Sequence, residues 1–293
     1  MSGRIDFAVP TPLAYFASLV AEDGSLSLVE AAIAIAQDEH PDLDIGAVLA
    51  EIDAMAEKLK RRVPADAGSM QRLRLLNRYF YSELGFAGNV NDYYDSDNSY
   101  LHDVLRTRRG IPITLAVLYI ELAAQIDLPV RGVCFPGHFL VKLRMDAGDS
   151  RGEVVIDPFT GQSLSREELD ELLAPYKRSQ GLTDDYDIPL GLFLQAASAR
   201  DVVARILRNL KEIHAAAADW PRLLAIHERL VVLLPEAWEE RRDRGITRAE
   251  LGSHAEAIDD LATYLAHRPD ASDGEAVRAR IAYLRAQHGP RLH

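Results

Sequence analysis

FPGHFLVKL, residues 135–143, and EVVIDPFTG, residues 153–161, are the two segments that say most about the fold. Both are short, rich in Val, Ile, Leu and Phe, and bounded by Gly or Pro, which is typical of β-strands. VRGVCF, residues 130–135, precedes them and has the same character. We therefore expect three short strands, of which the last two form an antiparallel pair joined through MDAGDSRG, residues 145–152.

A histidine and an aspartate lie at the ends of the last two strands. His138 begins one strand, and Asp157 ends the other just before a proline. One antiparallel register sets His138 opposite Asp157 and Lys142 opposite Glu153, with both pairs on one face. A carboxylate beside an imidazole fixes its tautomer and stabilises the imidazolium. The two residues are therefore candidate catalytic residues, although a histidine in a strand is more often structural.

Helical periodicity surrounds these strands on both sides. Residues 113–126 are so strongly apolar that we expect this helix in the middle of the fold. Asp97, Asn98 or Ser99 is expected to cap the short helix over residues 100–108. Ser165 with Glu168 three residues on predicts a capping box. The expected helices cover residues 25–40, 45–62, 70–86, 100–108, 113–126 and 165–176.

The C-terminal part is helical throughout and shows an internal repeat. Pro235 and Pro269 each close a helix and lie 34 residues apart, which is the tetratricopeptide period. Gly245 and Ala257 fall where two helices of such a repeat cross closely. We expect one regular repeat, a degenerate repeat before it, and a final helix over residues 274–287 that caps the array.

Composition narrows the class of protein. The 293 residues are 48% apolar and carry a net charge of −12, which is ordinary for a globular protein. Residues 1–60 hold 3 basic and 11 acidic side chains, which argues against binding to nucleic acid. The sequence has no apolar run long enough to span a membrane, no signal peptide at its start and a single cysteine, Cys134. These features predict a cytoplasmic protein that does not bind a membrane.

The order of one apolar helix, three strands, His and then Asp resembles the transglutaminase-like fold, which is related to papain-type cysteine proteases. The resemblance covers residues 98–161. That family places a cysteine at the start of the buried helix, and histidine and aspartate on successive strands. His138 and Asp157 match the last two, whereas the cysteine position falls on Pro112. The other positions that fit the family pattern are Gly110, Ala116, Pro129 and Arg131.

More closely, DSDNSYLHDVLRTRRGIPITLAVLYIELAAQIDLPVRGVCFPGHFLVKL, residues 95–143, together with IDPFTG looks like the bacterial SirB-type branch of that superfamily. Members pair an N-terminal transglutaminase-like domain with tetratricopeptide repeats. The resemblance implies an α+β, papain-related domain with a small antiparallel sheet, including N-terminal helices, over residues 1–180. It implies an all-α region of tetratricopeptide-like repeats over residues 190–293. RSQGLTDDYDIPL, residues 178–190, is the expected linker.

The proline at the cysteine position has a direct chemical consequence. Proline carries no nucleophile and no backbone N–H, so acyl transfer through a thiolate cannot begin at Pro112. Thr114 lies two residues further on, and a helix turns it about 200° away from that position. Cys134, four residues before His138, is the remaining nucleophile. A lone cysteine is usually buried and structural, and Cys134 is expected on a strand, where no helix dipole lowers its pKa.

We therefore expect a pseudoenzyme that acts as an interaction or regulatory module, with a protein or peptide partner bound through its groove and helical repeats. The alternatives are a cysteine-type acyltransferase or protease that uses Cys134 with His138 and Asp157, and a hydrolase in which the last two activate water. No cofactor is expected. No metal is expected either, because DSDNSY lacks the glycine of a calcium loop, with Tyr100 in its place. Tyr93 and Tyr94, near Arg108 and Arg109, are candidates to line a groove beside the site, but the preferred interpretation is that they pack or are solvated.

Overall fold

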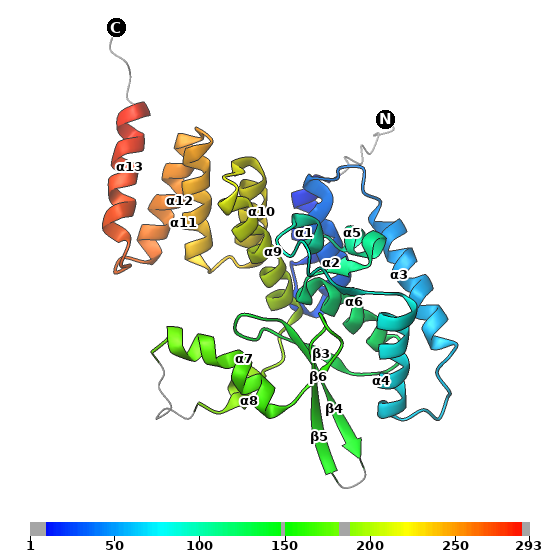
Figure 1. Ribbon diagram of the computed structural model, residues 1–293. Coiled ribbons are helices and arrows are strands. Elements are labelled where there is room, and N and C mark those ends of the chain that lie inside the picture. Colours follow the sequence, from blue (N-terminus) through cyan, green and yellow to red (C-terminus); the bar gives the residue numbers. More distant parts are fainter. Residues whose placement is uncertain (1–9, 148–149, 182–187, 289–293) are drawn as a thin grey trace, which may run out of the picture. The chain divides into compact units, whose positions relative to one another are not determined.

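The computed structural model describes residues 10–147, 150–181 and 188–288 (Figure 1). The chain forms two compact units, and the boundary between them lies inside helix α9 (Ala199–Ala216), after Ile206. The strand-bearing unit comprises residues 23–37 and the described parts of 42–206. The repeat unit comprises residues 10–22, 38–41 and 207–288. The first mixes helices with small sheets and the second is helical, so the fold class is α+β, as the sequence predicts.

Helix α6 (Pro112–Ala124) is the central element of the strand-bearing unit, which confirms the prediction for this segment. Pro112 is its first residue, where the missing N–H costs nothing because the first turn has no intrahelical acceptor. The helix is buried on almost every side. It packs against helices and against strands on either side of His138, namely α2 (Leu28–Ala34), α3 (Ile45–Lys60), α4 (Ser69–Asn77), α5 (Leu101–Thr107), β3 (Val130–Val133) and β4 (Leu140–Ala147).

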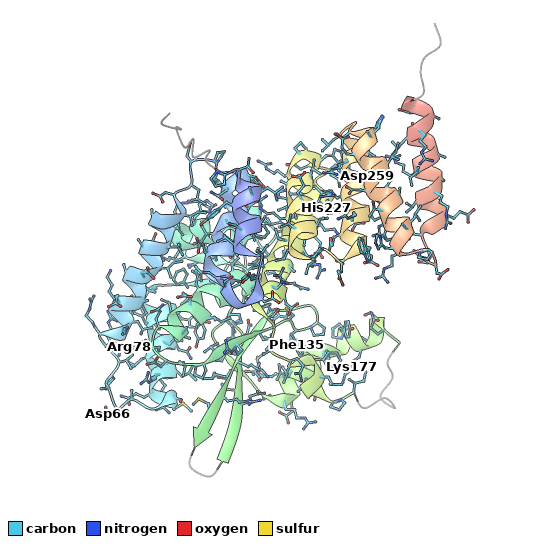
Figure 2. All side chains as sticks on the ribbon, turned by 180° about the vertical axis from the view of Figure 1, so that it is seen from behind. Asp66, Arg78, Phe135, Lys177, His227 and Asp259 are labelled. Atoms are coloured by element: carbon cyan, nitrogen blue, oxygen red, sulfur yellow. The ribbon has the colours of Figure 1, made fainter. Side chains whose placement is uncertain are left out.

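The main sheet has four antiparallel strands in the order β3-β4-β5-β6, where β5 is Ser150–Ile156 and β6 is Ser163–Leu164. One face of this sheet packs against α7 (Arg166–Ser179) and the residue that follows α8 (Leu190–Phe193). Phe135, labelled in Figure 2, belongs to the apolar cluster that joins them, with Val133, Leu140, Val155, Leu169, Leu173 and Leu194. Ser165 and Glu168 form the predicted capping box at the start of α7.

The register of β4 and β5 differs from the predicted one by two residues. Lys142 lies opposite Val155, and Arg144 lies opposite Glu153. A slip of two residues keeps every side chain on its face, so Lys142 reaches Glu153 diagonally, with Nζ 3.0 Å from Oε1. The strands also extend further than expected, because the ladder continues to Ala147 opposite Ser150. Residues 148–149 between them and residues 182–187 of the expected linker lie outside the described residues.

Two further local predictions were wrong. The residue that precedes α5 is Tyr100, whose side chain makes no capping hydrogen bond. Asp95 instead caps a short 3-10 helix, η4 (Ser96–Ser99), by accepting from the N–H of Asp97. The helix expected over residues 70–86 changes at Arg78 into a π-helical turn, η3 (Arg78–Glu83). A two-residue parallel pair that the sequence did not indicate joins β1 (Ala87–Gly88) to β2 (Arg109–Gly110).

The repeat unit contains the predicted tetratricopeptide geometry. Helix α11 (Trp238–Glu250) crosses α12 (His254–His267) at Gly245, where an added Cβ would lie 3.2 Å from the carbonyl oxygen of Ala257. This close crossing confirms the roles expected for the two small residues. The other helices of the unit are α1 (Pro12–Leu19), which packs on α10 (Trp220–Leu233), and the terminal α13 (Gly274–His288).

A buried ion cluster joins α11 to α12. Asp260 is 1% exposed and accepts two hydrogen bonds from Arg244, at 2.8 and 2.6 Å, and one from Arg248 at 2.9 Å. Buried charges of this kind are tolerated only when they are paired and hydrogen-bonded. His227 of α10, labelled in Figure 2, is also buried in this unit. No helix within the described ranges combines the length and apolarity needed to cross a lipid bilayer.

Candidate functional site

His138 and Asp157 are hydrogen-bonded to each other, with Nε2 of the imidazole 3.0 Å from Oδ1 of the carboxylate. The contact forms although the two residues are not directly opposite in the ladder. His138 lies two residues before β4, and Asp157 directly follows β5. The predicted pairing of imidazole with carboxylate is therefore present, and the side chains are 23% and 14% exposed.

A tight turn places the imidazole. The N–H of His138 donates to the carbonyl of Phe135 at 3.0 Å, and Gly137 has φ +71°. With Pro136 before it, this is the pattern of a type II turn, which favours proline at its second position and glycine, for its positive φ, at its third. The FPGH sequence thus fixes the direction in which β4 begins. Within the described residues, no protein group hydrogen-bonds Nδ1 of His138, so this nitrogen is the one available to a ligand.

Asp157 is held as a carboxylate by three donors. Its Oδ1 accepts from His138 and from the N–H of Phe159 at 2.9 Å, and its Oδ2 accepts from the hydroxyl of Thr160 at 3.1 Å. Burial alone would raise the pKa of Asp157, but the hydrogen bonds from His138, Phe159 and Thr160 outweigh it and hold the pKa below the usual value. A carboxylate of this kind orients the imidazole and stabilises its protonated form.

The loop that carries Asp157 is anchored from the helical part of the unit. The hydroxyl of Tyr81 donates to the carbonyl of Pro158 at 3.2 Å, and its ring lies so close to Gly161 that an added Cβ would be 2.9 Å from it. Gly161 has φ +76°, a conformation that favours glycine. Burial raises the pKa of the Tyr81 phenol, with Tyr119 and Asp157 acting in the same direction. The phenol therefore acts as a neutral donor at neutral pH.

Tyr81, Phe159 and Thr160 were missed from the sequence. Thr160 follows Asp157 by three residues, and this spacing is a weak signal for a local side-chain hydrogen bond. Tyr81 gives no such signal, because it is 77 residues from the carbonyl it contacts. Sequence patterns report local geometry and not this kind of distant contact.

Pro112, at the expected cysteine position, is buried as the first residue of α6. The hydroxyl of Thr114 is also buried, and it donates to the carbonyl of Asn98 at 2.7 Å and accepts from the N–H of Ile111 at 3.2 Å. These bonds close the start of the helix and occupy the hydroxyl. Thr114 is therefore a structural residue of α6, which agrees with the expectation that the helix turns it away from the nucleophile's position.

Cys134 differs from its prediction in two respects. It lies just after β3 instead of on it, and it is exposed instead of buried. The cause is strand alternation, because the neighbours Val133 and Phe135 both point into the apolar cluster. Within the described part of the chain, no hydrogen bond links the Cys134 thiol to the His138 imidazole. The structure thus brings together two of the three candidate site residues.

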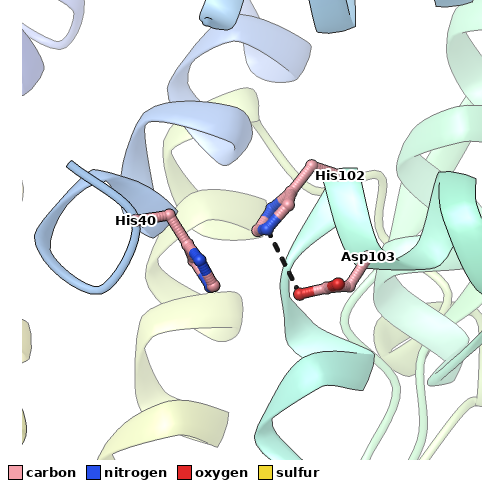
Figure 3. Close-up of side chains that lie close together, drawn as sticks. All are labelled: His40, His102 and Asp103. Atoms are coloured by element: carbon pink, nitrogen blue, oxygen red, sulfur yellow. Dashed lines mark ion pairs between the residues drawn. The ribbon is translucent and has the colours of Figure 1, made fainter. Parts of the chain in front are cut away.

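A second histidine–carboxylate pair lies on α5. Nε2 of His102 is 3.2 Å from Oδ2 of Asp103, and the dashed line in Figure 3 marks this ion pair. Asp103 is 5% exposed, and its Oδ1 accepts from Nε of Arg106 at 3.1 Å. Both of these side chains lie on the same helix as Asp103, and the guanidinium of Arg106 supplies a countercharge to the carboxylate.

Comparison with known proteins agrees with this geometry. The family model for the transglutaminase-like superfamily matches residues 46–208, and the model for the tetratricopeptide repeat matches residues 210–282. A UPF0162 protein of Xylella fastidiosa strain Temecula1 is 37% identical over 264 residues, which cover 90% of this chain and 92% of the relative.

More distant relatives align over almost the same length. A UPF0162 protein of Vibrio cholerae is 24% identical over 269 residues, covering 92% of this chain and 96% of the relative. The UPF0162 protein YchA of Escherichia coli K12 is 28% identical over 254 residues, covering 85% and 88%. No solved structure gives a significant match. The chain belongs to the transglutaminase-like superfamily, in its UPF0162 or SirB-type family, with C-terminal tetratricopeptide repeats.

Proposed function

We propose that this protein is a transglutaminase-like protein without the catalytic cysteine, which acts in the cytoplasm as an interaction or regulatory module. In this proposal, the surface beside His138 and Asp157, which the sequence predicts to form a groove, and the helical repeats bind a protein or peptide partner. The observation that carries the proposal is the combination of an assembled His–Asp pair with Pro112 as the first residue of α6. The pair has the geometry of a catalytic one, but the position of the nucleophile in the family pattern is Pro112, whose ring carries no nucleophilic atom.

The chemistry of the family requires what this position lacks. A thiolate at a helix N-terminus is stabilised by the helix dipole and by a neighbouring imidazolium, and it is the species that attacks an acyl group. Pro112 offers neither the sulfur nor the N–H that would point at a developing anion. The His–Asp pair then fixes the loops on which it lies and presents Nδ1 of His138 to a ligand.

The repeats support the second half of the proposal. Tetratricopeptide arrays present an extended surface on which protein segments dock. Ile246 of α11 is 40% exposed, and Tyr283 of α13 is 54% exposed. Large apolar side chains of this kind contribute to partner surfaces when they gather on one face.

One observation favours a second candidate, a cysteine-type acyltransferase or protease that uses Cys134 with His138 and Asp157. The thiol is exposed and lies four residues before the imidazole. Against it stand the position after a strand, where no helix dipole acts on the sulfur, and the absence of a thiol–imidazole hydrogen bond within the described residues. We therefore place the interaction module first.

The substitution Pro112→Cys in a Cys134→Ser background tests the site directly. The new thiol is expected at the start of α6, within reach of His138, so that iodoacetamide reacts with it at a pH well below the ordinary thiol pKa of about 8.5. Adding His138→Ala should raise the pH at which the new thiol reacts to that of an ordinary thiol. A thiol with an ordinary pKa in both backgrounds would show that Pro112 does not occupy the nucleophile's position.

Partner binding needs a separate test. His138→Ala in the tagged full chain should weaken retention of a co-purifying protein, because the imidazole lies on the proposed binding surface. The same protein should be lost with Ile246→Glu in the repeats and kept with Met70→Glu, a matched change at a residue that is 47% exposed in the strand-bearing unit. Turnover of an acyl substrate by the native protein, abolished by His138→Ala, would contradict the proposal.

A further inference from the structure

An exposed aromatic loop flanks the His138–Asp157 pair. We call residues 88–99 the tyrosine loop. Tyr94 is 80% exposed, Val90 is 75% exposed and Tyr93 is 42% exposed. Two adjacent rings and a valine are thus all exposed in one loop, which the packed interpretation from the sequence does not account for. Exposed apolar groups gathered in this way commonly mark a binding site.

The tyrosine loop is joined to the loop that carries Asp157. The N–H of Gly88 donates to the carbonyl of Phe159 at 3.1 Å. The Phe159 ring lies over Gly88 so closely that an added Cβ would be 2.3 Å from it. The ring centroids of Tyr93 and Phe159 are 5.9 Å apart. Because Phe159 also donates its N–H to Asp157, the aromatic rings and the His–Asp pair form one continuous surface.

Asn98 fixes the tyrosine loop from beneath. It is 4% exposed, and its Nδ2 donates to the carbonyls of Asp92 at 2.7 Å and Tyr93 at 3.3 Å. Its Oδ1 accepts from the side chain of Asn89 at 3.0 Å. The backbone around Tyr93 is therefore held in place without a partner, so that a ligand meets rings that are already ordered.

The rings are arranged to accept a cation. The centroids of Tyr93 and Tyr94 are 5.3 Å apart and their planes are inclined by 79°. The pair is T-shaped, so the edge of one ring meets the face of the other. A cation within about 6 Å of a ring face that stays open beside this contact is attracted by the quadrupole of the ring. The long aliphatic stem of a lysine or arginine would cover the exposed ring surface at the same time.

The charge around the rings has the matching sign. The tyrosine loop contains three aspartates and neither lysine nor arginine. Asp92 is exposed and forms no ion pair with any residue in the described ranges. Asp157 adds a carboxylate beside Phe159. Arg205 of α9 is the basic side chain whose charge acts on Tyr93, and the acidic groups outnumber it.

We propose that the tyrosine loop binds a lysine or arginine side chain of the protein partner, held over the rings of Tyr93 and Tyr94 beside the His138–Asp157 pair. The inference rests on the proposed function, because it names the chemistry of the segment that enters the groove. A basic, extended peptide segment is the occupant that the exposed rings and the local acidic charge fit together.

Three labelled peptides test this proposal with the full chain. They alternate glycine with lysine, with norleucine or with glutamate, and differ in nothing else. Fluorescence anisotropy at 0.15 M salt should show binding of the lysine peptide several-fold tighter than the norleucine peptide, since two cation–π contacts are worth about two- to five-fold each. Equal affinity for lysine and norleucine, or tighter binding of glutamate, would overturn the proposal.

Variants locate the binding. Tyr93→Ala and Tyr94→Ala should each weaken lysine-peptide binding about two- to five-fold, and Tyr283→Ala in α13 is the matched control at another exposed tyrosine. Equal losses in all three variants would mean that the acidic chain attracts cations without using the tyrosine loop, and would overturn the proposal.

Mass analysis of the bound peptide separates the two proposals. A covalent change that depends on His138 would contradict the interaction-module function and leave the lysine site intact. Failure of the lysine peptide to bind, with no turnover, would remove the lysine site and leave that function standing.

Discussion

Lowering the pH from 7 to 5 should weaken the repeat unit through one buried histidine. His227 lies in α10 and is 2% exposed. Burial lowers its pKa from 6.5 to about 4, and the positive charges of Lys211 and Arg244 act in the same direction. The carboxylates of Asp243 and Glu240 oppose this effect without overcoming it. The folded unit therefore keeps the imidazole neutral at a pH where the unfolded chain protonates it.

The sign and size of the effect follow from proton linkage. Because the unfolded state binds more protons than the folded state between pH 6.5 and about 4, stability falls as the pH drops through that window. For these two pKa values, the free energy of unfolding at pH 5 should be about 2 kcal/mol smaller than at pH 7. At pH 5 most carboxylates are still ionised, so the histidine dominates the change.

The chain offers a specific probe for this measurement. Its two tryptophans, Trp220 and Trp238, both belong to the repeat unit, so tryptophan fluorescence during urea unfolding reports that unit alone. His227→Gln should abolish most of the stability loss between pH 7 and pH 5, whatever its stability at pH 7. His254→Gln, at a half-buried position of the same unit, controls for the removal of a histidine. His267 is unsuitable because its ring stacks on Trp238. The same pH dependence in the native protein and in His227→Gln would refute the reasoning.

Two further substitutions test other parts of the structure. Asp260→Asn should destabilise the repeat unit by about 3–5 kcal/mol, because it leaves Arg244 and Arg248 without their shared buried carboxylate. Urea unfolding followed by tryptophan fluorescence measures this loss, and a value below about 1 kcal/mol would contradict the prediction. Gly88→Ala should displace the Phe159 ring, since the new Cβ would lie 2.3 Å from it, and cost about 1–3 kcal/mol. Thermal unfolding by circular dichroism measures that cost, and an unchanged midpoint would show that the ring moves freely.

Much of the candidate site could be inferred from local sequence. Phe135, Pro136, Gly137 and His138 carry the residues of a type II turn in order, so the start of β4 and the position of the imidazole follow from their backbone preferences. The pairing of His138 with Asp157 followed from strand alternation, which is unaffected by the two-residue error in register. Periodicity of two residues fixes the face of a strand but not its exact partner.

Contacts between distant segments could not be inferred in this way. The anchoring of the Asp157 loop by Tyr81 and the packing of Phe159 on Gly88 join segments that share no periodic signal. The same holds for α1, which packs with the repeats although the sequence assigned residues 1–180 to one domain. That domain division stays a prediction. Exposure of Cys134 was also missed, because the usual burial of a lone cysteine gave way to the alternation of Val133 and Phe135 around it.

The rate at which iodoacetamide alkylates Cys134, measured across pH in the native protein and in His138→Ala, bears most directly on whether any thiol is activated here. With the imidazole paired to Asp157, the pH dependence of Cys134 alkylation should be the same in both proteins. Alkylation of the native protein that begins at a clearly lower pH than alkylation of His138→Ala would mean that the His–Asp pair serves a working nucleophile after all.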